Sequence, residues 1–170
     1  MANTYVKIGS TVEVGAGGAA DITFSAIPAT YTDLLVVASV RGSDSGATNT
    51  NLRIQFNGST SNYSERQLYG NGSSATSATL TYASLGYVSS DGATASTFGN
   101  CQAYIPNYTS SAFKSISAEG VAEGNTTAML MALDAGLWSD TSAITSIKLF
   151  VPSFNLLQYS TATLYGISKS

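Results

Sequence analysis

The chain has 170 residues, of which 10% are charged, with no histidine, one cysteine and a formal net charge of −3. This inventory excludes a Ser-His-Asp triad, a Cys-His pair, zinc sites of the His/Cys type and a disulfide within the chain. The seven lysines and arginines are scattered, which argues against nucleic acid as a partner, and the negative charge disfavours an anionic membrane.

Strand patterns recur along the whole chain, whereas no window keeps the 3.6-residue apolar period of a helix. In the first third, strands are predicted at residues 5–8, 11–14, 21–24, 34–40 and 52–56. Residues 34–40 form an almost continuous apolar run, which is typical of a central strand covered on both faces. Further strands are predicted at residues 63–69, 79–88, 98–105, 113–119, 127–133, 144–151 and 161–167. Residues 126–133 also suit a short helix by propensity, although the pattern favours a strand.

Turn residues separate the predicted strands. Asn57-Gly58, Asn71-Gly72 and Asp91-Gly92 are dipeptides that favour the type I′ turns of hairpins. The prolines all lie at strand ends or in connections, where a missing N–H is tolerated. We therefore predict an all-β fold, a two-sheet antiparallel β-sandwich with jelly-roll-like topology, built as a single domain from residues 1–170.

A glycine-rich break at residues 15–20 sets the N-terminal segment apart. Residues 1–18 are either an arm that crosses to a neighbouring subunit or the first edge strand of the sandwich. In the first case the apolar residues of the segment would form an interface: Tyr5, Ile8, Val12 and Val14. Trp138, near a turn, is a further candidate interface residue, because tryptophan is enriched among contact hot spots, with a place in the core as the alternative.

The remaining chemistry is sparse. Glycoside hydrolysis needs only two carboxylates, and its candidates are Glu65, Glu119, Glu123, Asp134 and Asp140. None of them lies in a sequence setting that suggests a raised pKa, so surface or turn roles are expected. Residues 44–49 lack the ligand density of a calcium loop. Cys101 lies in an apolar strand pattern and is expected to be a small buried hydrophobe. We predict no enzyme activity, no cofactor and no metal site.

The aromatic residues are the other chemical resource. They either form a platform on which sugars stack or fill the core with their hydroxyl groups at its edge. The residues concerned are Tyr63, Tyr69, Tyr82, Tyr87, Tyr104, Tyr108 and Trp138.

Several segments, in order along most of the chain, resemble a family of small virion proteins of tailed bacteriophages. They are residues 22–34 (Ile-Thr-Phe-Ser-Ala-Ile-Pro-Ala-Thr-Tyr-Thr-Asp-Leu), residues 54–58 with the following Tyr63, residues 105–108 and residues 162–167. Many relatives place a Gly-Ser pair before the closing Leu-Tyr-Gly-Ile, whereas this chain has Gln-Tyr-Ser-Thr at residues 158–161. The family consists of jelly-roll-like modules that decorate capsids or form part of head and tail fibres.

The resemblance implies a structural protein of the virion. The function that it implies first is that of a capsid decoration (cement) protein on the capsid surface. Such a protein would bind the major capsid protein and copies of itself, as a homotrimer. The alternative is a receptor-binding module of a tail fibre or spike that binds a host surface glycan. The N-terminus lacks the basic and apolar regions of a signal peptide, so synthesis in the host cytoplasm is expected.

Overall fold

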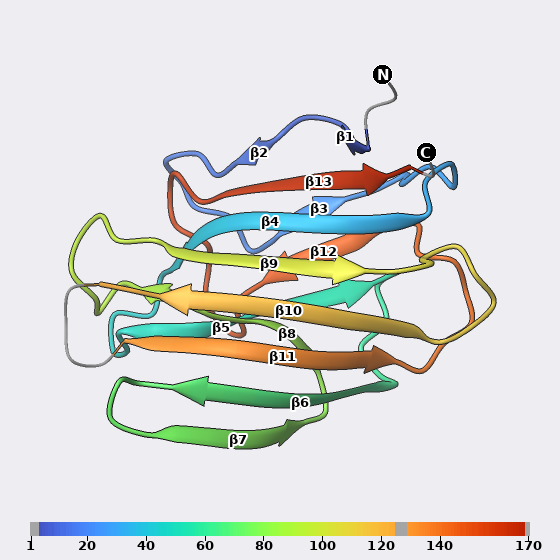
Figure 1. The fold of residues 1–170 in the computed structure, drawn as a ribbon. Helices are drawn as coiled ribbons and strands as arrows, with labels where there is room; N and C mark the ends of the chain where they lie inside the picture. Colours follow the sequence, from blue (N-terminus) through green and yellow to red (C-terminus); the bar gives the residue numbers. More distant parts are fainter. Residues whose placement is uncertain (1–3, 125–128, 169–170) are drawn as a thin grey trace.

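The structure is a computed structural model that describes residues 4–124 and 129–168. These residues form thirteen β-strands and no helix (Figure 1). The larger layer, sheet A, runs in the order β7 (Ala75–Leu80), β6 (Tyr63–Gly70), β11 (Leu130–Trp138), β10 (Lys114–Ala122), β9 (Gly99–Ile105), β4 (Asp33–Gly42) and β13 (Thr161–Ile167). Beyond β13 the edge is completed by two short strands, β1 (Tyr5–Lys7) and β2 (Val12–Glu13).

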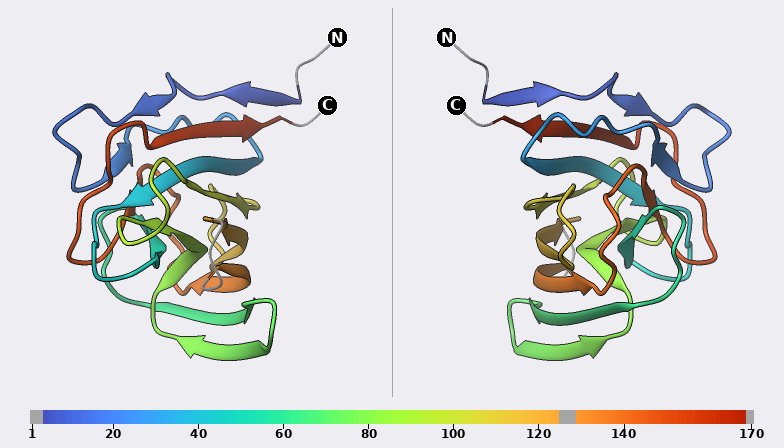
Figure 2. Two further views of the ribbon diagram at one scale, coloured as in Figure 1. Left: turned by 90° about the vertical axis from the view of Figure 1, so that its left-hand side faces the viewer. Right: turned by 90° about the vertical axis from the view of Figure 1, so that its right-hand side faces the viewer.

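The smaller layer, sheet B, has the order β3 (Ile22–Phe24), β12 (Ile147–Phe150), β5 (Asn49–Phe56) and β8 (Ala83–Ser90). Neighbouring strands of both sheets are antiparallel. The two sheets are joined by a short parallel contact, in which Arg41 and Gly42 at the end of β4 pair with Ser89 and Ser90 of β8. Side views show the two layers stacked on each other (Figure 2).

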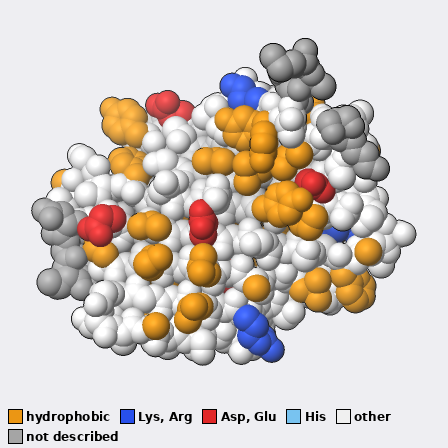
Figure 3. Space-filling view, viewed as in Figure 1, with side chains coloured by type: hydrophobic (Ala, Val, Ile, Leu, Met, Phe, Trp, Pro, Cys, Tyr) orange, Lys and Arg blue, Asp and Glu red, His pale blue; other side chains and the backbone are white. Residues whose placement is uncertain are grey.

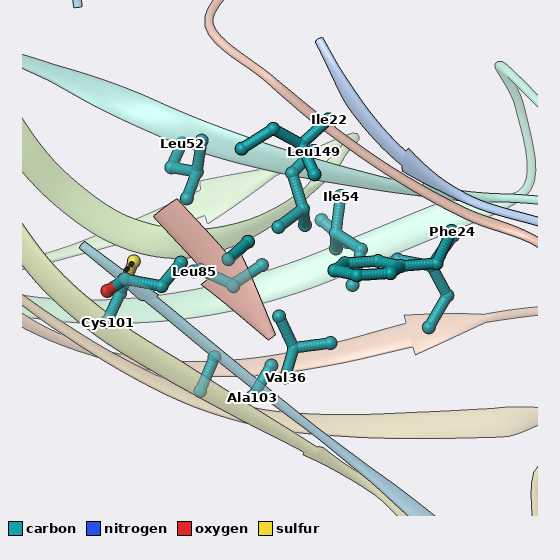
Figure 4. Close-up of a cluster of buried hydrophobic side chains, with 14 of the residues drawn as sticks. Ile22, Phe24, Val36, Leu52, Ile54, Leu85, Cys101, Ala103 and Leu149 are labelled. Carbon is teal, nitrogen blue, oxygen red and sulfur yellow. Dashed lines mark hydrogen bonds between the residues drawn. The ribbon is translucent and has the colours of Figure 1, made fainter. Parts of the chain in front are cut away.

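The core lies between the two sheets and follows from the period-2 alternation of the strands. On β4, for example, Leu34, Val36, Ala38 and Val40 are buried, while the residues that alternate with them, Leu35, Val37 and Ser39, face outwards. Side chains of both layers meet in this space (Figure 4), among them Ile22, Ile54 and Leu149 from sheet B and Val36, Cys101 and Ala103 from sheet A. The predicted all-β sandwich is confirmed, and the jelly-roll form of it stays a prediction.

Two details of the predicted strands are corrected. The predicted strand 79–88 is two strands, because β7 ends in sheet A at Leu80 and β8 begins in sheet B at Ala83. No glycine, proline, asparagine or aspartate marks this corner; instead, the Tyr82 hydroxyl hydrogen-bonds Asn51 and the Arg53 guanidinium lies 3.6 Å from the centre of the Tyr82 ring. The predicted strand 127–133 is a strand from Leu130 onwards, and its first two residues lie outside the described part.

Strand β4 is central, as predicted, but it is not covered on both faces. Leu35 and Val37 on its outer face are half-buried and Ser39 is exposed. The apolar run therefore has one face in the core and one face partly open to solvent. The described part of the N-terminal segment pairs with β13 of its own chain, along the edge of sheet A, and a contact of this segment with a neighbouring subunit stays a prediction.

The predicted turn dipeptides all lie in connections, but not all of them form hairpins. Asn57 and Gly58 both have positive φ values, 51° and 71°, yet they join β5 to β6 and so carry the chain from sheet B to sheet A. Asn71-Gly72 lies in the loop that links β6 to its neighbour β7. Asp91-Gly92 follows β8, and Gly92 N–H donates to the carbonyl oxygens of Asp44 and Ala47.

Candidate functional site

The outer face of sheet A presents large apolar side chains to solvent (Figure 3). On β6, β10 and β11 the residues that point away from the core include Leu68, Val121, Met131 and Leu133, which are 44–59% exposed. They are cross-strand neighbours: Leu68 lies opposite Leu133, and Met131 lies opposite Val121. Side chains in such register contact one another on the same face, so these four residues form one apolar group.

A second apolar group occupies the same face over β9, β4 and β13. Tyr104 lies opposite Leu35, which in turn lies opposite Tyr165. The Tyr104 hydroxyl donates to Asp33 Oδ2 over 2.9 Å, and this hydrogen bond to a carboxylate raises the pKa of Tyr104. The bond holds the tyrosine ring against the sheet while leaving it 39% exposed.

A polar pair separates the two apolar groups. Gln102 Nε2 donates to Glu119 Oε1 over 2.5 Å, across the paired strands β9 and β10. Two shallow hollows of about 240 Å³ and about 140 Å³ lie beside this pair, with Leu133 lining both. The face therefore combines apolar contact area with a central amide and carboxylate, an arrangement suited to binding another protein surface.

Two of the carboxylates considered for glycoside hydrolysis meet inside the molecule. Glu65 on β6 and Asp134 on β11 are 1% and 4% exposed. Ser84 N–H donates to Glu65 Oε2 over 2.7 Å, and Gln67 Nε2 donates to Asp134 Oδ1 over 2.6 Å. The other oxygens, Glu65 Oε1 and Asp134 Oδ2, are buried without a hydrogen-bond partner among the described residues, and the electrostatic interaction between the two carboxyl groups disfavours charge on both at once.

Burial raises the pKa of Glu65 to about 9, and it also raises the pKa of Asp134. The expectation that none of the acidic residues has a raised pKa is therefore wrong for these two. Sequence reasoning missed the pair because Glu65 and Asp134 are 69 residues apart and meet only through the pairing of β6 with β11. Both side chains are closed off from solvent, so the pair belongs to the polar interior and is not accessible to a substrate. Glu119 and Glu123 are exposed and Asp140 is half-buried, away from this pair.

Trp138 is a core residue, which corrects its assignment as an interface residue. It is 1% exposed, and its ring packs against Phe56 and Tyr63 with centroid distances of 5.6 Å and 6.2 Å. Its position at the end of β11 on the inner face decides this, because alternation along the strand turns residue 138 towards sheet B. The remaining tyrosines do not share one surface: Tyr63 and Tyr108 are buried, while Tyr104 lies on the outer face of sheet A.

The four N-terminal candidate residues differ in exposure. Tyr5 is 57% exposed, whereas Val14 is 3% exposed and is a member of the core. Ile8 and Val12 are half-buried and pack against that core. Val14 is therefore corrected to a packing residue, and an interface role stays a prediction for Tyr5, Ile8 and Val12.

A depression of about 410 Å³ lies at one end of the sandwich, and the 152–160 loop forms part of its wall. Tyr159 lines it with 63% of its surface exposed and a φ of 69°, a left-handed conformation that is costly for a bulky residue. Ser96 lines it too, with a φ of 63°, and so do the side chains of Asn155 and Gln158. In folded proteins, residues with strained backbone conformations cluster at active sites and at sites that bind ligands.

The buried Arg41 forms the floor of this depression. Its Nη1 atom donates to the carbonyl oxygens of Thr94 and Thr97 over 2.8 Å and 2.9 Å. Its Nη2 atom donates to Ala93 O and forms an ion pair with Asp91 over 3.4 Å. One guanidinium thus holds the loop that follows β8 in place, and it fixes the wall on which Ser96 lies.

Four further observations bear on the function. Among the described residues there is no group of three or more residues with side chains that could hold a metal ion, and no helix could cross a membrane. Asp44, in the loop considered for calcium, uses its carboxylate to accept from the backbone of Gly46. In comparisons with known proteins, no family model, no curated protein and no solved structure matches this chain.

Proposed function

We propose that this protein is a structural component of a tailed-bacteriophage particle, a capsid decoration protein that binds the major capsid protein through the outer face of sheet A. The observation that carries the proposal is the set of exposed apolar side chains in cross-strand register on that face, led by Leu133 and Met131. Single exposed hydrophobic residues need no explanation, but a group that extends over neighbouring strands marks a contact site.

The size of the face suits a contact that is weak alone and strong in repetition. Six strands at a spacing of about 4.8 Å and about seven residues of 3.3 Å give a plane of about 24 Å by 23 Å. Such a plane covers about 550 Å², which is below the roughly 800 Å² per partner of a standard specific interface, so a single contact should be weak. A symmetric shell offers the same contact many times. If copies of the protein are linked to one another, these weak contacts act together and the overall affinity for the shell rises.

The chemistry of the face also favours a protein partner. Its central charge, Glu119, is already bonded to Gln102, and the Asp33 carboxylate is already bonded to Tyr104. Binding through this face is driven by burial of apolar surface, so it should depend little on salt. Tight binding that disappears between low and physiological salt would contradict this contact.

The test uses phage particles that lack the protein and measures binding of the purified chain to them. Leu133→Lys places a charge in the centre of the apolar group and should weaken binding by at least about 10-fold. Phe154→Lys is the matched control, because Phe154 is also exposed, at 40%, but lies in the connection between β12 and β13. Equal binding of both variants would overturn the proposed contact. Copy number is the second readout, since hundreds of copies over the head mean decoration.

The alternative function, binding of a host glycan by a tail-fibre or spike module, is supported by one specific observation. The depression at Tyr159 combines an exposed aromatic ring with amide and hydroxyl side chains, which is the chemistry that sugars stack on and hydrogen-bond to. A glycan array tests this alternative directly. Glycan binding by the wild type that Tyr159→Ala abolishes would favour adhesion, and so would a copy number of a few dozen or fewer at the tail. The homotrimer is a further part of the proposal, tested by the mass of the protein on the particle.

A further inference from the structure

Strand β7 is the outermost described strand of sheet A, and no described residue pairs with one of its two edges. Within residues 4–124 and 129–168, β7 pairs with β6 alone. It lies at the opposite end of the sheet from β1, as the front and side views both show (Figures 1 and 2). An unpaired edge exposes a row of backbone N–H and C=O groups that can extend the sheet with another strand.

The hairpin geometry decides which backbone groups face this free edge. Asn71 N–H donates to Ser74 O over 3.2 Å, so residues 71 and 74 form a hydrogen-bonded pair. Such pairs alternate with non-hydrogen-bonded pairs along an antiparallel ladder. The register of β6 with β7 then assigns Thr76, Ala78 and Leu80 to the bonds with β6. The N–H and C=O groups of Ala75, Ser77 and Thr79 point to the free edge.

This edge lacks the features that normally prevent pairing. The sequence of β7 is Ala-Thr-Ser-Ala-Thr-Leu, with no charge and no proline, and its register with β6 is uninterrupted. The other edges are protected. The edge beyond β13 is divided into two short strands that carry Lys7 and Glu13, and β3 of sheet B is three residues long.

We propose that β7 pairs with β7 of a second copy of this chain, antiparallel and across a two-fold axis at Ser77. In this register Ser77 faces its own equivalent, and Ala75 of each copy faces Thr79 of the other. All three outward-facing residues then form hydrogen-bonded pairs, which gives about six backbone hydrogen bonds. A register shifted to Ala78 gives only about four.

A second copy is the occupant that best fits this edge. A two-fold interface must be self-complementary, and β7 satisfies this requirement because its small, uncharged side chains neither repel nor clash with themselves. Ala75, Ser77 and Thr79 are also exposed, so none of the residues that the structure describes covers them. The contact is small, so the dimer should be weak and concentration-dependent.

The pairing goes beyond the proposed function but has a consequence for it. A two-fold axis perpendicular to the sheet leaves the outer faces of both copies on the same side. The two apolar faces would then contact one flat partner together, which supplies the link between copies that avidity needs. The dimer itself is measured without any particle, so its failure and the failure of shell binding are distinguishable.

The first test is sedimentation of the full-length protein over a range of concentrations. Ser77→Pro removes an outward N–H without removing a bond to β6, and proline is tolerated at such edge positions. We expect it to weaken dimerisation by at least about 30-fold with an unchanged melting temperature. Ser77→Thr keeps the N–H and should dimerise like the wild type. A wild-type protein that stays monomeric at about 1 mM, or self-association that Ser77→Pro does not weaken, would overturn the proposal.

Disulfide cross-linking of cysteine variants is a second test, which can refute the proposal even if Ser77→Pro does not fold. In the proposed register the two Cα atoms of residue 77 are about 5.5 Å apart, within the range of a disulfide. Ser77→Cys should therefore form covalent dimers under mild oxidation, whereas Ala75→Cys and Thr79→Cys should cross-link only when mixed. The native Cys101 does not interfere, because it is 2% exposed and burial raises its pKa to about 12. Equal cross-linking of all three single variants would refute the register.

Discussion

The aromatic ring of Tyr31 covers the backbone of Gly166, so closely that a Cβ atom on Gly166 would overlap the ring atoms. Tyr31 is in turn held by Tyr108, whose hydroxyl accepts from Tyr31 N–H over 3.4 Å and donates to Pro28 O. Segments separated by more than 50 residues meet here at one end of the sandwich. Tyr31, Tyr108 and Gly166 are thus packing residues at this end.

The contact predicts a large effect from a small substitution. Gly166→Ala should lower the free energy of unfolding by about 1–3 kcal/mol, because the added methyl group forces the Tyr31 ring or β13 to move. Urea denaturation measures this effect. Gly15→Ala is the control, since a Cβ at residue 15 meets no atom within 4 Å, and it should change stability by less than about 0.5 kcal/mol. Equal effects of both substitutions would show that Tyr31 does not occupy this position.

The buried pair of Glu65 and Asp134 predicts how stability depends on pH. Burial raises the pKa of Glu65 to about 9 in the folded protein, from 4.5, and the unfolded chain therefore binds fewer protons between these values. The contribution of Glu65 to the free energy of unfolding is therefore fully present below about pH 4.5 and is lost as the pH rises towards 9. The slope for one proton is at most about 1.4 kcal/mol per pH unit. The raised pKa of Asp134 acts in the same direction.

Glu65→Gln tests this assignment. Its amide mimics the protonated carboxyl group, accepting from Ser84 N–H and donating to Asp134, so it should flatten the loss of stability between pH 5 and pH 9. Denaturation curves at several pH values give the slope. Glu119→Gln, on the exposed outer face, should leave the slope of the wild type unchanged. A slope that Glu65→Gln does not alter would assign the pH dependence to other groups.

Backbone strain at Tyr159 predicts an unusual order of stability. Tyr159→Gly and Tyr159→Ala both remove the ring, but only glycine relieves the cost of a φ of 69°. Tyr159→Gly should therefore be more stable than Tyr159→Ala by about 1 kcal/mol, measured by thermal or chemical unfolding. Equal stability of the two variants would mean that the loop relaxes and that no strain is stored at this residue.

The core position of Trp138 predicts a loss of stability rather than a loss of binding. Trp138→Ala should lower the free energy of unfolding by about 3–5 kcal/mol, because it opens a cavity between Phe56 and Tyr63. Phe113→Ala, at a residue that is 56% exposed, should cost less than about 0.5 kcal/mol. A stable Trp138→Ala variant with impaired shell binding would return this residue to the interface.

Regular alternation made the strands predictable, while contacts distant in sequence did not follow from it. The pattern of residues 161–167 predicted β13 with its correct bounds, because every second residue has to be apolar to face the core. The break between β7 and β8 was missed because no turn residue occupies the corner at Thr81 and Tyr82. The position of Trp138 was also not predictable from the local pattern, since a tryptophan near a strand end suits both a core and a surface position.

The sequence by itself determined an all-β sandwich with little chemistry for catalysis, because composition and the period of apolar residues act locally along the chain. The tertiary structure alone decided which outward-facing residues become neighbours, such as Leu68 beside Leu133. It also decided that Glu65 meets Asp134 and that, in the described part of the chain, β7 has a strand on one side only. These properties depend on strand order and register, which arise from pairing between segments far apart in the chain.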